Sequence, residues 1–500
     1  MSAGGLIRRQ RIVPEPLLPA AVGLAAAVAA AGITSLVAAP VAWLWVAICA
    51  GATVPIVIWF AAQGRLFEPL PLFAAVCAAT FVVRPIQLML EYEDLYSHFF
   101  PRDPVQSLVL MEGQEVSLFV TQELQNTLEP AMARATGACA LFLVGMLVGY
   151  RYLRSAALNG RLSRLGQRIA PSRVPSIVAI SLAIGLAAQV AVIAKAGGPA
   201  ESLKSASDQK ALSESFVLFV LSGFAYVAVP IWIAWRVPRS RLEWAALLLS
   251  VMAVCAFSLI AGSRARVFIT LMVLALVVHY LHRRWRPREI VIGLVLLLGF
   301  GSFFVVFRQV ADKHSLSDAR QAASEHIFDV RVIENDITYF DDVLYATSIY
   351  GQTRSHKHGA FLVDAFRSYI PRRIDPGKPE GGDVAFRKVV WGEQLGAGRP
   401  PTAVGDLFID FSFPGVAIGA LLFGAAAHAL LGLLRGGLRG REYRVVLYAI
   451  LLVVLYEWLV GTLSIAIGFI FTLLLPFLVA IHGFGRLPRL PGLRDRVAAE

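Results

Sequence analysis

The sequence predicts an all-α polytopic membrane protein, and three observations support that fold class. Of its 500 residues, 57% are hydrophobic and 16% are charged, against roughly 25% charged residues in a soluble globular domain. Apolar runs of about 20 residues, the length a helix needs to cross a bilayer core, recur along the whole chain. Arginines gather in alternate connections between these runs, as they do when successive helices cross a membrane in opposite directions.

Twelve apolar runs are expected to span the membrane. The first begins behind Arg8, Arg9 and Arg11, and a basic start before an apolar run also occurs in signal peptides. We interpret it as a span because it extends to about Ala39 and the next run follows almost at once. The expected spans are residues 17–38, 41–62, 70–90, 128–150, 174–195, 215–235, 243–262, 266–282, 289–310, 408–434, 445–461 and 463–483.

The arginines also give the spans an orientation. If the chain starts inside the cell, 25 arginines in the termini and in alternate connections all fall on the cytoplasmic side. Both termini are therefore expected in the cytoplasm. The net charge of +12 is then a signal of topology, and we do not expect nucleic acid as a partner.

The same path divides the chain into four parts. Residues 1–310 hold spans one to nine, 311–405 form a large extracytoplasmic loop, 406–485 hold spans ten to twelve, and 486–500 form a basic cytoplasmic tail. A loop of this length is uncommon in a compact fold unless it has a function.

The long loop is expected to be partly helical and to pack back on the membrane helices as a cap. One apolar stripe with helical spacing predicts this: Ile327, Val330, Ile333, Ile337, Phe340 and Leu344. Acidic residues dominate positions 312–342 and basic residues dominate positions 354–378. The acids of "FDDV" (340–343) are interpreted as a solvated helix face, and no metal site is expected there.

Two arginines occupy the outer end of spans seven and eight, where positive charge is disfavoured. Arg264 and Arg266 lie in the segment "GSRARVF" (262–268). A charged side chain near the membrane usually has a partner and often marks a site, and the planar guanidinium suits phosphate oxygens. The alternatives are that these arginines reach lipid headgroups or pair with the acids of "EYEDLY" (91–96).

The basic half of the long loop is the second part of this candidate anion site. Its expected contributors are Arg354, Arg367, Arg372, Arg373 and Lys378. The alternative is a solvated basic face that the preceding acidic helix neutralises.

Three segments together resemble the O-antigen polymerase (Wzy-type) family of oligosaccharide repeat-unit polymerases. They are "GSRARVF" (262–268), "SYIPRRIDPGKP" (368–379) and "PPTAVGDLFIDFSFPGVAIGALLFG" (400–424), about 45 residues in the expected outer regions. Two positions depart from the family's pattern. Asp406 stands where glutamate is more frequent, and Asp410 where asparagine is common.

The resemblance implies a GT-C-like membrane-embedded glycosyltransferase in a bacterial plasma membrane. Such an enzyme joins oligosaccharide repeat units carried on undecaprenyl pyrophosphate into a surface polysaccharide, on the outer face of the membrane. The lipid-linked oligosaccharide and the bilayer are the implied partners, and a chain-length regulator is a third. We expect no cofactor and no metal ion, because no paired acids stand out as a metal site.

The expected chemistry assigns roles to particular residues. Arg264 and Arg372 would stabilise the departing pyrophosphate, and Asp406 is the first candidate for the base that accepts the hydroxyl proton. Asp410, His356 and His358 are further candidates near the substrate. Glu457 is an acid within an apolar run, so we expect it at a site with an arginine as its partner.

Three other functions remain open at this point. A ligase would move a finished glycan onto a different acceptor. A flippase would carry the same lipid-linked sugar across the bilayer, but transporters commonly show repeated halves and charges at mid-membrane, and neither pattern is visible here. A non-catalytic scaffold would not need a basic patch at the lipid boundary.

Overall fold

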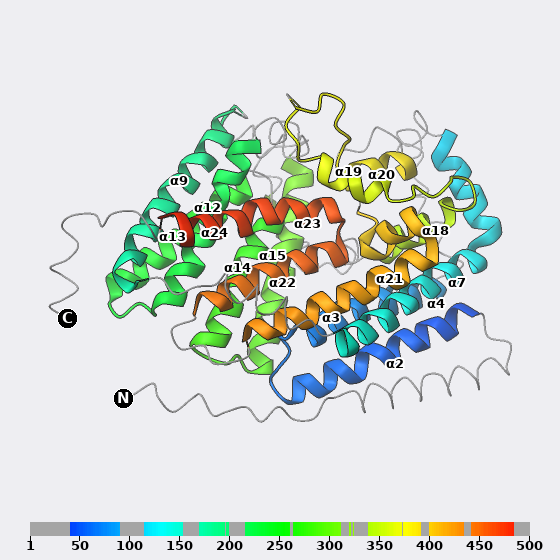
Figure 1. The fold of residues 1–500 in the computed structure, drawn as a ribbon, viewed down its shortest axis with the longest axis horizontal. Helices are drawn as coiled ribbons and strands as arrows, with labels where there is room; N and C mark the ends of the chain where they lie inside the picture. Colours follow the sequence, from blue (N-terminus) through cyan, green and yellow to red (C-terminus); the bar gives the residue numbers. More distant parts are fainter. Residues whose placement is uncertain are drawn as a thin grey trace.

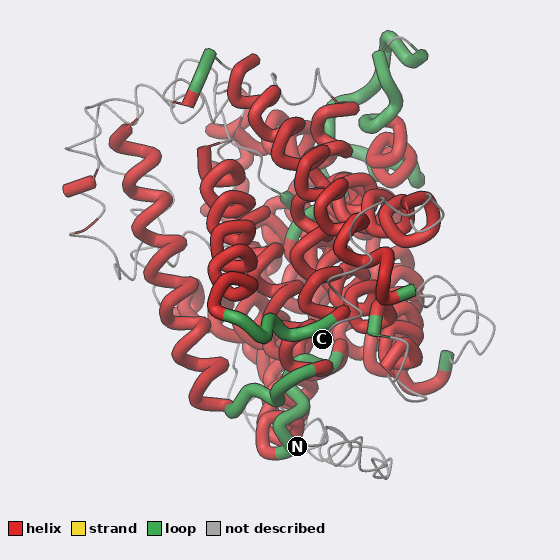
Figure 2. The backbone as a smooth tube through the Cα atoms, turned by 90° about the vertical axis from the view of Figure 1, so that its left-hand side faces the viewer, coloured by secondary structure: helices red, strands yellow, loops and turns green. Residues whose placement is uncertain are grey.

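The structure is a computed structural model that describes most of the chain. The described residues are 41–90, 115–153, 170–195, 197–199, 216–260, 264–311, 320–321, 324, 339–372, 374–391, 400–434 and 442–484. Helix makes up most of this backbone (Figure 2), and the bridge pair between Tyr350 and Arg354 is the sole β-type pairing in it.

Nine helices or continuous helical segments in the described ranges are long and apolar enough to cross a membrane, and each coincides with an expected span. The fold class, an all-α polytopic membrane protein, is therefore confirmed. The nine are α2 (Val41–Ala62), α3–η2–α4 (Pro69–Ala78, Ala79–Val83 and Arg84–Leu90), α7 (Glu115–Tyr152), α9 (Val174–Lys195), α12 (Phe216–Trp235), α13 (Arg241–Ile260), α21 (Thr402–Leu434), α22 (Tyr443–Val460), and α23–η5–α24–η6 (Leu463–Phe469, Ile470–Leu474, Leu475–Leu478 and Val479–Gly483).

The other three expected spans have different outcomes. Two coincide with helices outside these nine, α14 (Arg264–Leu281) and α15 (Pro287–Ala311). The first, residues 17–38, lies outside the described residues. The count of twelve and the GT-C-like arrangement thus stay predictions.

Large apolar side chains cover the outside of α13 and α15, including Leu249 and Leu296, which are 69% and 64% exposed. Such a surface suits contact with lipid.

Glycines allow α7 and α21 to pack with their backbones in contact. A Cβ atom on Gly149 of α7 would overlap the backbone of Leu421, and one on Gly424 of α21 would overlap the backbone of Met146. Small residues at such contacts are typical of membrane helices, which associate through close van der Waals packing. The two helices run side by side in Figure 1.

Three short helices lie near one end of this bundle (Figure 1): α18 (Tyr339–Ile349), α19 (Ala360–Arg367) and α20 (Gly382–Trp391). Helix α18 packs against α7 and α21; we call the segment 339–391 the cap, and its place outside the cell stays a prediction. Phe340 and Leu344 of the apolar stripe are buried, while Ile327, Val330, Ile333 and Ile337 lie outside the described residues.

The interpretation of "FDDV" as a solvated face is wrong. Asp341 and Asp342 are 1% and 2% exposed. Arg84, which begins α4 and is 3% exposed, donates through Nε and Nη2 to the two carboxylate oxygens of Asp341, over 3.0 Å and 2.8 Å. The carboxylate is buried because a buried arginine from a distant helix neutralises it.

Helix α21 is broken near its start. Ser412 has φ 57° and ψ −154°, and Pro414 has no N–H group. The carbonyls of Phe408, Ile409 and Asp410 would otherwise accept from residues 412–414. They accept instead from the segment 356–358, through the ring Nδ1 of His356 and the backbone N–H groups of Lys357 and His358. Residues 402–411 thus form a separate short helix before the long span, and residues 402–410 of it are buried.

Candidate functional site

Asp406 lies in this first part of α21 and has no exposed surface. Its Oδ2 accepts a 2.7 Å hydrogen bond from the backbone N–H of Leu463 and a 3.3 Å bond from Nε1 of Trp458. Its Oδ1 is buried and has no hydrogen-bond partner within the described residues. An orphaned carboxylate oxygen in a buried position is costly, and such atoms occur at sites where a further partner binds.

The turn between α22 and α23 holds the donor of this bond and links it to the cap. Thr462 is the N-cap of α23, and its hydroxyl lies 2.6 Å from that of Ser464. The Ser464 hydroxyl accepts from the backbone N–H of Gly382, at the start of α20, and its carbonyl accepts a 2.7 Å bond from the Tyr369 hydroxyl. Ser464 therefore joins the cap to α23 through two hydrogen bonds.

Asp383 is a functional candidate that the sequence analysis missed. A Cβ atom on Gly381 would lie 2.8 Å from Oδ1 of Asp383 and 3.8 Å from Oγ of Ser464, so the carboxylate and the hydroxyl flank the same glycine. Asp383 also interacts electrostatically with Asp406. Burial raises the pKa of Asp383 above its ordinary value, although backbone N–H groups and Arg387 oppose that shift.

Arg266 supplies positive charge to the surroundings of Asp383 and Tyr369. Its guanidinium lies over the ring of Phe219, with Cζ 4.5 Å from the ring centroid, and forms no ion pair with a described carboxylate. Burial and the nearby Asp383 raise the pKa of the Tyr369 hydroxyl, and Arg266 acts in the opposite direction. The Tyr369 hydroxyl is thus within electrostatic range of both a carboxylate and a guanidinium.

We call Asp406, Asp383, Tyr369, Ser464 and Arg266 the Asp406 site. Aromatic rings border it, since Phe216, Tyr369 and Phe471 have centroids 5.2–6.2 Å apart. A polar cluster beside aromatic rings can hold an anionic group next to a sugar. In the described ranges, no three His, Cys, Asp or Glu side chains converge as metal ligands.

Asp410, His356 and His358 have structural contacts at the break in α21. Both oxygens of Asp410 accept from N–H groups in the first turn of α19, those of Phe361 and Leu362, over 3.0 Å and 2.9 Å. The ring of His356 donates to the carbonyl of Phe408, and the backbone N–H of His358 donates to the carbonyl of Asp410, at the break in α21. Asp410 therefore caps the N-terminus of α19, and a role for these three residues in binding substrate stays a prediction.

The basic loop residues that we expected to bind an anion differ in whether other groups already occupy them. Arg367 donates to Asp375 over 2.9 Å and pairs with Asp364 over 3.4 Å, so local acids neutralise it. The ammonium of Lys378 donates to the carbonyl of Ser368, and burial and the nearby Arg372 lower its pKa. Arg372 itself is exposed.

The remaining candidates are placed as follows. Arg354 is exposed beside Tyr350. Glu457 is partly buried next to Trp458, and the arginine partner that we expected for it is not found among the described residues. The side chain of Arg264 and all of Arg373 lie outside the described residues, as do Gly262 and Ser263.

Two comparisons with known proteins gave no result, and one gave a match. Residues 116–472 match the model of a family described as "Putative O-antigen polymerase". The matched region includes every residue of the Asp406 site. A search of curated proteins and a search of solved structures each returned no match.

Proposed function

The chain belongs to this O-antigen polymerase family and is a membrane polysaccharide polymerase, and from that premise we propose that it elongates glycans carried on a polyprenyl pyrophosphate. The acceptor is the sugar of one lipid-linked repeat unit, and the donor is the glycan on another. The lipid carrier is undecaprenyl pyrophosphate, as the resemblance of the three motifs implies.

The proposed reaction transfers the donor's anomeric carbon to an acceptor hydroxyl. A new bond forms between the hydroxyl oxygen and the anomeric carbon, and the bond from that carbon to the pyrophosphate oxygen breaks. The electron pair of the broken bond stays on the pyrophosphate, and the hydroxyl proton passes to a carboxylate. Chemically, the site must therefore stabilise new negative charge and accept one proton.

The observation that carries the proposal is the arrangement around Tyr369. Arg266 brings a guanidinium without a described ion-pair partner, and Asp383 brings a carboxylate, within electrostatic range of the same hydroxyl. Arg266 would bind the pyrophosphate, together with Arg264 and Arg372. Asp383, which is partly exposed, would meet the acceptor hydroxyl. Asp406 would hold the α22–α23 turn and accept the proton through Oδ1, which lacks a hydrogen-bond partner.

The topology of the arginines supports an outward-facing site. The connections that carry Arg65, Arg236 and Arg283, and the last turn of α7 with Arg151, lie at the end of the spans opposite the α22–α23 turn if each helix crosses once. Cytoplasmic connections are enriched in arginine, so the Asp406 site would face the outside of the plasma membrane and both termini the cytoplasm. The reaction is proposed to need no metal ion, and a chain-length regulator is proposed as a partner.

A strain that lacks the gene tests the proposal. If the protein is a polymerase, the surface glycan of this strain will run on a gel as single repeat units. The wild-type gene will restore the ladder of bands that longer glycans give. If unextended lipid carrier accumulates and no surface sugar appears, the protein is a flippase. If an unattached long polymer accumulates, it is a ligase.

A further inference from the structure

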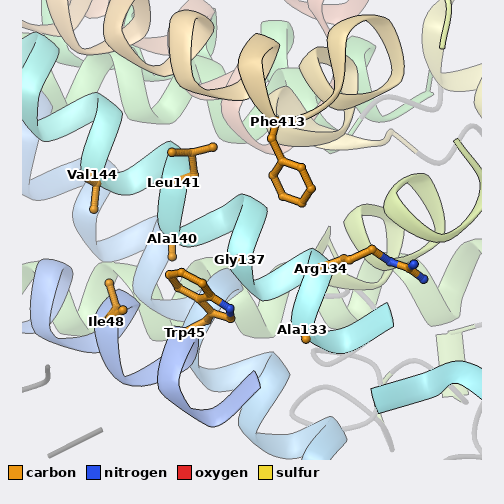
Figure 3. A pocket seen from close by; sticks show the side chains of 9 residues that line it. All are labelled: Trp45, Ile48, Ala133, Arg134, Gly137, Ala140, Leu141, Val144 and Phe413. Carbon is orange, nitrogen blue, oxygen red and sulfur yellow. The ribbon is translucent and has the colours of Figure 1, made fainter. Parts of the chain in front are cut away.

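A lateral apolar groove lies outside the Asp406 site, between α2, α7 and α21 (Figure 3). Its volume is about 650 Å³. Its lining includes Trp45 of α2, Arg134, Leu141 and Val144 of α7, and Phe413 of α21. Val144 and Phe413 are 36% and 37% exposed, so the groove opens on the outer surface of the helix bundle, where lipid would surround the protein.

The groove reaches the break in α21. Phe413 follows Ser412 directly, and its ring packs edge-on against Phe408 with centroids 5.2 Å apart. Phe408 in turn contacts the ring of His356 at 5.5 Å. One end of the groove is thus linked to His356 through the ring contacts of Phe413 and Phe408.

Basic groups mark that end of the groove. Arg134 extends its guanidinium away from the apolar side chains (Figure 3) and lies against the side-chain amide of Gln352. Arg354 and Lys357, which are exposed on the same segment as Gln352, form no ion pair with a described carboxylate. An apolar channel that ends at basic side chains is complementary to a lipid with a phosphate head.

We propose that this groove holds the hydrocarbon chain of a polyprenyl phosphate carrier, with the phosphate beside Arg354 and Lys357. The inference rests on the proposed function, because joining two lipid-carried glycans requires two lipid chains near one site at the same time. Arg266, on α14, serves one carrier. The groove, lined by α2, α7 and α21, serves the other.

Photolabelling tests the groove directly. The protein is reconstituted in vesicles of phosphatidylethanolamine and phosphatidylglycerol with a radiolabelled polyprenyl monophosphate that carries a benzophenone at the end of its chain. We expect cross-links to α7 near Leu141 and Val144. Unlabelled polyprenyl phosphate will compete, and added phosphatidylglycerol will not.

Two matched variants show whether the groove is the labelled surface. Val144→Trp fills the groove and is expected to lower the labelling several-fold and to raise KM for lipid-linked substrate more than it lowers kcat. Val148→Trp places the same side chain four residues along α7, at a position 40% exposed that does not line the groove. It should leave both labelling and elongation unchanged.

Several results would overturn the inference. Labelling that Val144→Trp does not reduce, or that phosphatidylglycerol competes equally well, would mean an ordinary bilayer lipid contact. A photoreactive residue at position 144 that cross-links to residues 17–38, or to a second copy of the chain, would mean that protein fills the groove.

The same experiment separates this inference from the proposed function. Asp406→Asn should keep the labelling although it stops elongation. Labelling of a wild-type protein that elongates no glycan would contradict the proposed function and leave the groove assignment intact. Elongation without labelling would contradict the groove assignment alone.

Discussion

The backbone N–H of Leu463 donates a 2.7 Å hydrogen bond to Oδ2 of Asp406, across 57 positions of sequence. This bond joins the start of α21 to the start of α23, directly after the turn that follows α22. Because Ser464 follows in that turn and binds both Gly382 and Tyr369, the membrane helices and the cap are fixed to each other at the same point.

Asp406→Asn is expected to reduce elongation by about 100-fold or more, the usual effect of losing a proton acceptor. The asparagine oxygen can still accept from Leu463 and Trp458, so the melting temperature of the purified variant should change little. The length distribution of the surface glycan measures the effect. A normal ladder from this variant would reduce Asp406 to a structural role.

Arg266→Ala should abolish long chains, with a loss of about 100-fold or more if the guanidinium stabilises the departing pyrophosphate. Arg266→Lys should also be poor, because an ammonium lacks the planar fork that binds two phosphate oxygens. Arg367→Ala is the matched control, since local acids already neutralise Arg367. Equal ladders from all three variants would remove the anion site from the mechanism.

Asp383 should make the stability of the protein depend on pH. Burial raises its pKa in the folded state, so folding favours the protonated form. The stabilising contribution is present below the unfolded pKa of roughly 3.9 and is lost as the pH rises through the folded pKa. Asp383→Asn stays neutral. Its melting temperature relative to wild type should therefore rise from acid to neutral pH, and a constant difference would contradict the assignment.

Breaking the pair between Arg84 and Asp341 should be strongly destabilising. Either Arg84→Met or Asp341→Leu leaves one buried charge without its partner, which costs about 3–5 kcal/mol. The double variant Arg84→Met with Asp341→Leu should recover most of that loss. Unfolding in a denaturing detergent measures the stability of the two single variants and of the double variant. Additive losses of stability in the double variant would argue against an ion pair between Arg84 and Asp341.

Much of the fold could be predicted from the sequence because apolar length is such a direct constraint. Nine expected spans match described helices that are long and apolar enough to cross a membrane, and two more match α14 and α15. The break at Ser412 was not predicted, although Pro414 inside the apolar run was a signal, because proline removes the N–H group that a continuous helix needs. The burial of Asp341 depends on Arg84, which lies 257 positions away, and no local pattern around "FDDV" reveals it.

The candidate site was predicted less completely. Asp406 and Arg266 could be found because a charge at the end of an apolar run is unusual. The same reasoning would have found Arg84 within "FVVRPIQLML" (81–90) if applied there. Asp383 was missed because an acid after two glycines in a polar loop is ordinary in sequence. Its surroundings come from Ser464 and Tyr369, which only the folded chain brings to it.

The most direct test of the central claim uses the purified protein in vesicles, with lipid-linked repeat units as the only substrate and EDTA present. The account predicts a ladder of longer glycans, one polyprenyl pyrophosphate released for each new linkage, and neither product from Arg266→Ala. A wild-type protein that releases no pyrophosphate carrier, or that forms the ladder only when a divalent metal ion is added, would contradict it.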